Sequence, residues 1–267
     1  QGVDCLYEVA VKRAAPVSIR LVDNMQFQFG QALKPEADSV MKGVMDKIKK
    51  WYVLNALKFE PGNMVAATLL FEGDADEVAM QEKKLYAIAA KYGGVKAGED
   101  NGVRGYFLTY MIAYLRDLGF QYKFIAESFE TTVPFANVYE TCERVKERIY
   151  AAAKESGVKY KPFVSCRVTQ LYDTGACIYF YFGFIWQGLD NPVDVYSHIE
   201  HSAREEILKQ GGTISHHHGI GKLRSMFMKD TIGDNGIRVL KGLKETIDPK
   251  NIFAVGNLVF GKEHSHH

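Results

Sequence analysis

The chain has 267 residues, of which 47% are hydrophobic and 24% are charged, and its formal net charge is +1. This balance excludes the basic excess that nucleic-acid binding needs on one face, and no run of about 18 uncharged apolar residues predicts a membrane-spanning helix. The four cysteines are scattered without a C-x-x-C pair, so we expect reduced, mostly buried thiols.

Helical and strand-like patterns alternate along the chain. Residues 2–13 form an amphipathic helical pattern, and five later stripes of apolar residues have helical spacing, each expected to be the buried side of a surface helix. These stripes are Val40, Val44, Ile48 and Trp51; Leu85, Ile88 and Tyr92; Val138, Cys142, Val145 and Ile149; Tyr196, Ile199, Ala203 and Ile207; and Ile237, Leu240, Leu243 and Ile247. Strand-like runs occupy residues 17–23, 64–72, 122–130, 163–170 and 176–185. The pattern predicts an α+β fold with a mainly antiparallel sheet covered by helices, followed by C-terminal helices.

The last strand-like run has two different faces, because side chains alternate along a strand. The face expected to be core holds Ile178, Phe180, Phe182 and Phe184. The other face holds Cys177, Tyr179, Tyr181 and Gly183. This second face carries tyrosines toward a more polar environment, although half-buried packing is an equally good interpretation of them.

The string Ser-His-His-His-Gly-Ile-Gly-Lys at residues 215–222 follows a helix expected to end near Gln210 and precedes a short helix expected at residues 223–228. A metal site is one interpretation, but consecutive histidines in an extended segment point to opposite sides and no ligand spacing accompanies them. A phosphate-binding P-loop would need the G-x-x-x-x-G-K-[ST] spacing. An exposed turn is a further alternative, but the glycines favour an active-site loop whose imidazoles supply hydrogen bonds or protons.

Two arginines interrupt apolar segments. Arg116 ends an apolar helical run at residues 108–115, and the neighbouring Asp117 could neutralise it. A solvated helix end is the simpler interpretation of Arg116, because an unpaired buried arginine is costly. Arg20 lies inside a strand-like run, where a charge can face solvent. From the residues alone, each arginine could be either a surface charge or part of a functional site.

Six strings occur with undisturbed spacing: residues 18–21 (Ser-Ile-Arg-Leu), 97–102 (Ala-Gly-Glu-Asp-Asn-Gly), 127–131 (Glu-Ser-Phe-Glu-Thr), 166–173 (Cys-Arg-Val-Thr-Gln-Leu-Tyr-Asp), 177–182 (Cys-Ile-Tyr-Phe-Tyr-Phe) and the histidine string through Arg224. Together they resemble the alkyldihydroxyacetonephosphate synthases, of the vanillyl-alcohol-oxidase type of FAD-linked enzymes. The resemblance runs from Gln1 to about Val259, with Ala126 where the family often has glycine. Related D-lactate and D-2-hydroxyglutarate dehydrogenases usually have a single histidine before Gly-x-Gly, so the triple histidine is the distinguishing feature.

The resemblance implies a flavoenzyme with two domains, in which an FAD-binding domain precedes this sequence. Residues 1–210 correspond to its cap and substrate-binding domain. Residues 211–260 correspond to the active-site histidine loop and to helices that pack towards the FAD domain, and residues 261–267 are expected to be a loose tail. The chain shows no FAD-binding fingerprint of its own, so we expect it to be a fragment that is inactive when isolated.

The implied reaction exchanges the acyl group of 1-acyl-dihydroxyacetone phosphate for a long-chain fatty alcohol in ether-lipid biosynthesis, with FAD as cofactor and no net redox change. The resemblance assigns substrate binding beside the flavin to Arg116, importance for activity to Arg20, acid/base catalysis to Tyr179, and catalytic histidines to His216, His217 and His218. No metal is expected. A free tyrosine has a pKa of about 10, so we expect Arg116 or a histidine to lower it for base chemistry.

The resemblance also implies peripheral membrane association, a homodimer and a location in peroxisomes or related organelles. The chain does not end in the peroxisomal address Ser-Lys-Leu. Two other functions stay open from the sequence. One is an FAD-linked 2-hydroxyacid dehydrogenase of the same superfamily, and the other is a binding or dimerisation module without catalysis.

Overall fold

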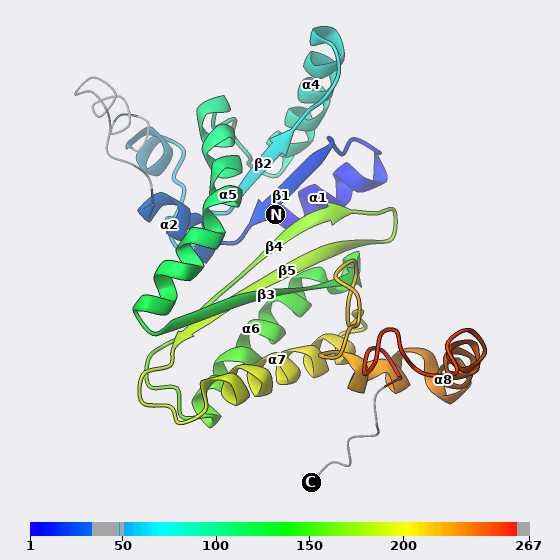
Figure 1. The fold of residues 1–267 in the computed structure, drawn as a ribbon. Helices are drawn as coiled ribbons and strands as arrows, with labels where there is room; N and C mark the ends of the chain where they lie inside the picture. Colours follow the sequence, from blue (N-terminus) through cyan, green and yellow to red (C-terminus); the bar gives the residue numbers. More distant parts are fainter. Residues whose placement is uncertain (34–47, 49–50, 261–267) are drawn as a thin grey trace.

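A five-stranded sheet forms the centre of the computed structural model, which describes residues 1–33, 48 and 51–260 apart from the side chains of 104–113. The strand order is β2-β1-β4-β5-β3 (Figure 1). The strands are β1 (Ser18–Val22), β2 (Ala66–Leu70), β3 (Phe124–Pro134), β4 (Phe163–Leu171) and β5 (Gly175–Ile185). Each neighbouring pair in this sheet is antiparallel, so the predicted α+β class and strand direction are confirmed.

Four helices enclose the main core together with the sheet. They are α1 (Gly2–Val11), α4 (Ala75–Lys91), α6 (Val138–Glu155) and α7 (Pro192–Lys209). One hydrophobic cluster joins the buried residues of these helices to those of the strands. The stripes predicted for α4, α6 and α7 are confirmed, since the fully or largely buried residues include Leu85, Ile88, Val138, Val145, Ile149, Ile199, Ala203 and Ile207.

Within the described residues, the remaining α-helices are α2 (Asn24–Ala32), α5 (Glu99–Gln121) and α8 (Met228–Ile247). Short helical segments are η1 (Tyr52–Ala56), η2 (Phe135–Asn137) and η3 (Ser225–Phe227). Helix α5 contacts both β2 and β3, the two edge strands, and so connects one edge of the sheet to the other. Among the described residues, no helix combines the length and the apolar character that crossing a bilayer requires.

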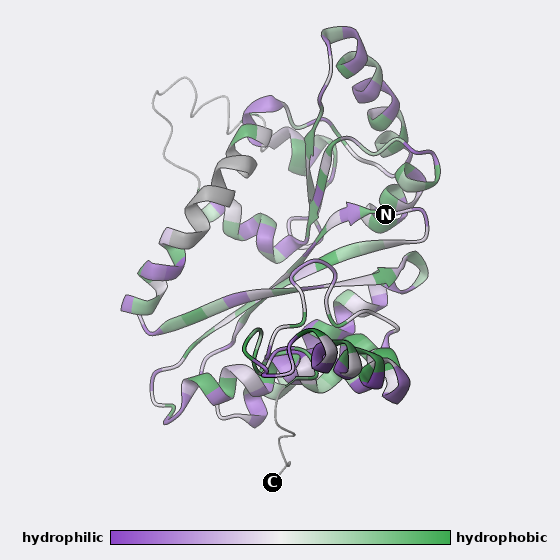
Figure 2. Ribbon diagram, turned by 45° about the vertical axis from the view of Figure 1, so that its right-hand side comes forward, coloured by the Kyte–Doolittle hydropathy of each residue, from purple (hydrophilic) through white to green (hydrophobic). Residues whose placement is uncertain are grey.

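Two predicted buried stripes are only partly confirmed or are contradicted where the structure describes them. In α8, Ile237 and Leu240 are half-buried, and Leu240 packs against a small second hydrophobic cluster. Leu243 and Ile247 of α8 are 54% and 80% exposed, and Ile48 and Trp51 are also exposed; Val40 and Val44 lie outside the described residues. Within α8 only Met228 is buried, because the helix touches the rest of the chain mainly through a small second cluster with Ile214 and Phe227. Apolar residues recur along the remainder of α8 (Figure 2). The short helix expected at residues 223–228 is the single turn η3 that leads into α8.

The two faces of β5 differ as the alternation predicts. Its four predicted core residues are at most 1% exposed, and Phe182 stacks on Tyr196 of α7 with ring centres 4.8 Å apart. On the other face Tyr179 and Tyr181 are half-buried. Gly183 on that face has no room for a side chain, because an added Cβ would lie 2.5 Å from the Phe124 ring of β3.

Candidate functional site

Polar side chains form a row across the sheet face opposite the phenylalanine core. The strand register pairs Glu130 of β3 with Tyr179 of β5, and Tyr179 with Arg167 of β4. On β1, Val22 pairs with Arg167, so Arg20, two residues away, points to the same face. Side chains far apart in sequence therefore meet on one surface.

A β-bulge adds one more polar residue to this face. The pairing of β4 with β5 shifts after Val168, and Gln170 then pairs with Cys177. Thr169 is the extra residue, so Gln170 lies on the same face as Arg167, which strict alternation would not allow. The sequence pattern alone therefore could not place Gln170 at the site.

Glu130 holds the histidine loop from beneath. Its carboxylate is fully buried and accepts hydrogen bonds from the Ser215 hydroxyl at 2.9 Å and from the backbone N–H groups of His216, His217 and His218 at 2.6, 3.3 and 2.9 Å. Burial raises the pKa of Glu130, but these donors outweigh it and the pKa is lowered overall. The ionised carboxylate thus turns the loop backbone inward, and its Oε1 atom also lies 3.4 Å from Nδ1 of the His218 imidazole.

The entry to the histidine loop has a second buried anchor, Arg204 of α7. Its guanidinium is fully buried, donates to the carbonyl oxygen of Ile214 at 2.6 Å and pairs with Glu200 at 2.6 Å. Just before Ile214, Gly212 packs so closely that an added Cβ would lie 2.8 Å from the Thr131 hydroxyl oxygen of β3. The loop therefore leaves α7 along a fixed path.

The histidine loop lies against Tyr179. The Tyr179 hydroxyl forms a hydrogen bond with Nε2 of His217 and lies 3.1 Å from Nε2 of His218. His216 instead contacts the hydroxyl of Tyr172, 2.6 Å from its Nε2 atom. The structure therefore brings Tyr179 together with two of the three predicted histidines, and places the third beside a different tyrosine.

The protonation of Tyr179 differs from the expectation. Burial is the largest effect and raises the pKa of Tyr179 to about 12, although the nearby guanidinium of Arg167 lowers it. The hydrogen bond with a histidine that we expect for base chemistry is present, but the pKa of Tyr179 is raised and not lowered. Burial also lowers the pKa of His218. At neutral pH Tyr179 therefore holds its proton and can donate it to a neutral imidazole.

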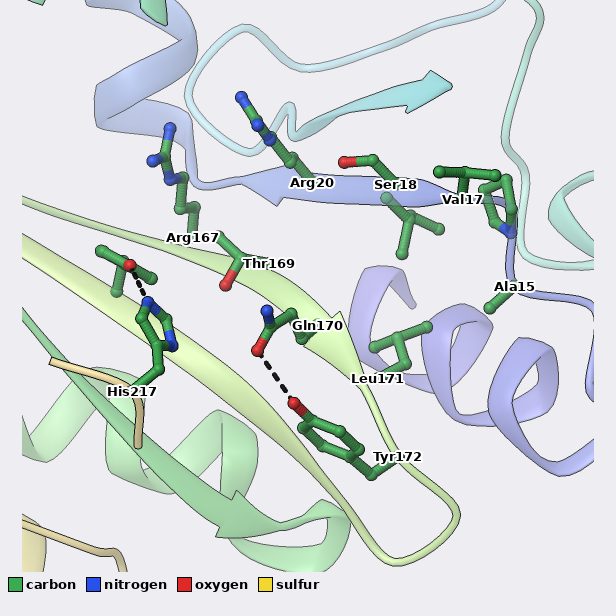
Figure 3. A pocket seen from close by; sticks show the side chains of 13 residues that line it. Ala15, Val17, Ser18, Arg20, Arg167, Thr169, Gln170, Leu171, Tyr172 and His217 are labelled. Atoms are coloured by element: carbon green, nitrogen blue, oxygen red, sulfur yellow. Dashed lines mark hydrogen bonds between the residues drawn. The ribbon is translucent and has the colours of Figure 1, made fainter. Parts of the chain in front are cut away.

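A cavity of about 400 Å³ opens beside Tyr179 and His217 (Figure 3). Its walls come from β1, β4, β5 and the loop before β1. The polar side chains that line it, besides Tyr179 and His217, are those of Ser18, Arg20, Arg167, Thr169, Gln170 and Tyr172. Such a volume suits a small polar ligand.

The two predicted arginines have different positions. Arg20 lines the cavity with Tyr179, whereas Arg116 lies on α5 outside it, 48% exposed and 3.6 and 3.8 Å from Glu127 and Asp117. The pairing of Arg116 with Asp117 matches the alternative of a neutralised surface charge. The structure leaves the substrate-binding role of Arg116 a prediction.

Three residues offer an arrangement of metal ligands that sequence spacing did not reveal. One ligand atom from each of Cys177, His216 and His217 lies within 4.8 Å of the others, because the sheet supplies a cysteine under the loop. Burial, however, raises the pKa of Cys177 to about 11, which opposes the thiolate that a metal needs. In this arrangement the two imidazoles are also hydrogen-bond partners of tyrosine hydroxyls.

Sequence reasoning missed Glu130 and Arg167 as site residues. Both are charged residues inside apolar strands, which is the same signal that drew attention to Arg20. A search for every charge within a strand-like run would have found them.

Comparisons with known proteins place this geometry in a family. The family model described as FAD linked oxidases, C-terminal domain, matches residues 1–258. The chain belongs to this family. It is 47% identical over 97% of its length to an alkyldihydroxyacetonephosphate synthase of Caenorhabditis elegans, and 27% identical over 94% to that of Dictyostelium discoideum. The sequence resemblance is thereby confirmed. The chain spans only 43% and 40% of these two relatives.

Solved structures show the same fold. A structure of an alkyldihydroxyacetonephosphate synthase has a TM-score of 0.68 and 23% identity, with 94% of this chain and 42% of that chain covered. A p-cresol methylhydroxylase structure has a TM-score of 0.60 and 14% identity, with 99% and 50% covered. Proteins of different activity therefore share this sheet and its helices, so the fold alone does not determine the reaction.

Proposed function

We propose that the whole protein is an alkyldihydroxyacetonephosphate synthase and that this chain is its cap and substrate-binding region. The reaction exchanges the acyl group of 1-acyl-dihydroxyacetone phosphate for a long-chain fatty alcohol. The observation that carries this proposal is the 47% identity over 97% of the chain to a protein of that name. The contact of Tyr179 with His217 and His218 supports it.

The residues of this chain fit one end of a flavin site. The cavity of about 400 Å³ suits a three-carbon phosphate compound, whereas FAD is an extended dinucleotide and larger. When bound, FAD supplies the electrophilic centre that holds the substrate carbon. We infer that Tyr179 and the histidine loop face this reactive end, and that the rest of FAD binds outside this chain.

The proposed chemistry assigns proton transfer to Tyr179 and the histidines. One C–O bond to the leaving carboxylate breaks, one C–O bond to the alcohol forms, and the alcohol loses its proton, so no electrons are gained or lost. Tyr179 holds its proton at neutral pH, since burial raises its pKa to about 12. Tyr179 passes its proton to the imidazole of His217, and the resulting tyrosinate accepts the proton of the alcohol. His217 then gives its proton to the departing carboxylate, which leaves as the fatty acid, so both side chains return to their starting state.

Further roles in the proposal come from the family resemblance. Arg116 binds substrate beside the flavin, and Arg20, which lines the cavity, is important for activity. His216 is a catalytic histidine together with His217 and His218, and it contacts the Tyr172 hydroxyl. The protein associates peripherally with membranes as a homodimer, and it acts in ether-lipid biosynthesis in peroxisomes or a related organelle.

An assay of the full-length protein tests the proposal. With 1-acyl-dihydroxyacetone phosphate and labelled hexadecanol, we expect labelled alkyl-dihydroxyacetone phosphate. Reduction of an electron acceptor by a 2-hydroxyacid, without alkyl exchange, would instead establish the dehydrogenase alternative. Metal analysis of the same preparation tests the metal-free chemistry, which is contradicted if chelation removes stoichiometric zinc and activity together.

A further inference from the structure

We propose that Arg167, together with Arg20, binds the phosphate group of the substrate in the cavity beside Tyr179. This assignment rests on the proposed function and deepens it. Arg167 comes from β4 and Arg20 from β1, and both side chains project from the same side of the sheet (Figure 3). A guanidinium can bind a phosphate dianion through two parallel N–H bonds, and Arg20 adds a second positive charge to the cavity that Arg167 lines.

The aromatic rings of β5 hold Arg167 in a fixed orientation. Its guanidinium carbon lies 4.9 Å from the ring centre of Tyr181 and 5.4 Å from that of Tyr179. Such cation–π contacts use the face of the guanidinium and leave its edges for hydrogen bonds, one of which involves Tyr181 and raises the pKa of Arg167. A phosphate bound there would lie near the Tyr179 ring, so the three-carbon dihydroxyacetone part of the substrate can extend from the phosphate towards the phenol.

The charge around Arg167 also favours an anion. No ion pair formed by the described residues includes Arg167, and its buried Nε atom has no hydrogen-bond partner among them. Burial lowers the pKa of Arg167 most, and the like charge of Arg20 lowers it further, although Tyr181 and Tyr179 raise it. A bound dianion would offset both the burial and the repulsion between the two arginines.

The backbone of the histidine loop is the competing phosphate site, and it is already occupied. Successive N–H groups can form an anion-binding nest, and those of His216, His217 and His218 do so here. Their anion is the carboxylate of Glu130, at 2.6 to 3.3 Å. The loop therefore has no free N–H groups at these positions for a substrate phosphate, and the arginine pair is the alternative on the same face.

Substitution in the full-length protein tests this assignment. Arg167→Met keeps a long apolar stem over the tyrosine rings and removes the charge, and Arg167→Lys keeps the charge without the planar fork. The matched control is Arg144→Met on α6, where Arg144 is 56% exposed and pairs with Glu140 and Glu147. For each protein, the Michaelis constants of both substrates, the FAD content and the competitive inhibition by inorganic phosphate are measured.

For Arg167→Met we expect the KM for 1-acyl-dihydroxyacetone phosphate and the inhibition constant of phosphate to rise together, on the order of tenfold to a hundredfold. The KM for the fatty alcohol and the FAD content stay at wild-type values, Arg167→Lys is intermediate, and Arg144→Met is unchanged. Unaltered phosphate inhibition in Arg167→Met overturns the assignment, and so does loss of FAD, which would make Arg167 a flavin contact.

A binding measurement separates this proposal from the proposed function. Inorganic phosphate should raise the melting temperature of the wild-type protein at constant ionic strength, and Arg167→Lys should reduce the shift. This result supports the anion site even if no alkyl exchange is found. If Arg167→Met does not fold, the wild-type protein and Arg167→Lys still test the phosphate site. A wild-type protein whose melting temperature does not rise with phosphate contradicts the proposal.

Discussion

At the scale of single residues, the Tyr179 hydroxyl is the group whose removal is most informative. Tyr179→Phe in the full-length protein should lower alkyl exchange by about 10²- to 10⁴-fold, because acid/base catalysis contributes about that much. The substitution leaves the half-buried ring in place, so the melting temperature should change little. Turnover measured beside thermal unfolding checks both, and near-normal turnover removes Tyr179 from the acid/base role.

Glu130 gives a prediction that depends on pH. Glu130→Gln leaves buried N–H groups of the histidine loop poorly satisfied, which should cost about 1–3 kcal/mol. The pKa of Glu130 is lowered in the folded chain from its usual 4.5. Its contribution to stability is therefore complete above about pH 4.5 and is lost as the pH falls through the folded-state pKa.

Urea unfolding of wild type and Glu130→Gln at several pH values measures this effect. The difference between the two proteins should be largest near neutral pH and should shrink below about pH 4.5. Alkyl exchange should also fall in the full-length variant, since the imidazoles lose their support. A difference in stability that does not depend on pH contradicts the ionised anchor.

Substitution of Arg116 can test the role that the family resemblance assigns to it, because the structure shows only a surface position for this side chain. Its ion pairs with Glu127 and Asp117 are exposed, and such pairs contribute little to stability. Arg116→Lys should therefore fold normally, while turnover falls about tenfold or more, because lysine cannot form a planar bidentate contact. If KM and kcat both keep their wild-type values, Arg116 is an ordinary charge at the surface of α5.

At the scale of elements, close packing between β5 and β3 predicts that a side chain at Gly183 lowers the stability of the fold. An alanine Cβ at Gly183 would lie 2.5 Å from the Phe124 ring and 2.8 Å from the carbonyl oxygen of Ile125. Gly183→Ala should therefore destabilise the chain by about 1–3 kcal/mol. The control is Gly242→Ala in α8, where no atom lies within 4 Å of the added Cβ, and helix propensity favours alanine.

Chemical denaturation of both glycine variants tests whether close packing at Gly183 causes the expected loss of stability. A lower midpoint for Gly183→Ala and an equal or higher midpoint for Gly242→Ala agree with the structure. Equal midpoints for the two variants would show that β3 moves away at little cost.

The elements also show what sequence could predict here. The sequence correctly predicted the phenylalanine face and the tyrosine face of β5, because successive side chains of one strand point to opposite faces of the sheet. The bulge at Thr169 depends on pairing with a second strand, so Gln170 could not be assigned to the tyrosine face. Likewise the contact of Glu130 with the loop joins residues far apart in sequence, which local pattern does not encode. The α8 stripe is helical as predicted, but Leu243 and Ile247 are exposed while Leu240 packs against the second cluster, because periodicity predicts a face and not its partner.

At the scale of the whole molecule, the exposed side of α8 and the family membership lead to one prediction. Residues 1–267 purified alone should be colourless and inactive, because we place most of the FAD site outside this chain. Exposed apolar residues such as Leu243, Ile247 and Phe253 should also promote self-association. A visible spectrum and light scattering check this. Yellow protein with stoichiometric FAD contradicts the placement of the cofactor, and Ile247→Glu should reduce any association.

The strand order has a consequence for how the chain acquires its site during synthesis. Strands β4 and β5 are joined by a short turn, whereas β1 reaches its place beside β4 only after more than half of the chain has been made. Distant pairings close large loops and form late. The seam between β1 and β4 runs beneath the cavity that holds Arg20 and Arg167. The β4–β5 hairpin alone brings Tyr179 beside Arg167, whereas the proposed anion pocket is complete only once β1 has paired with β4 and added Arg20.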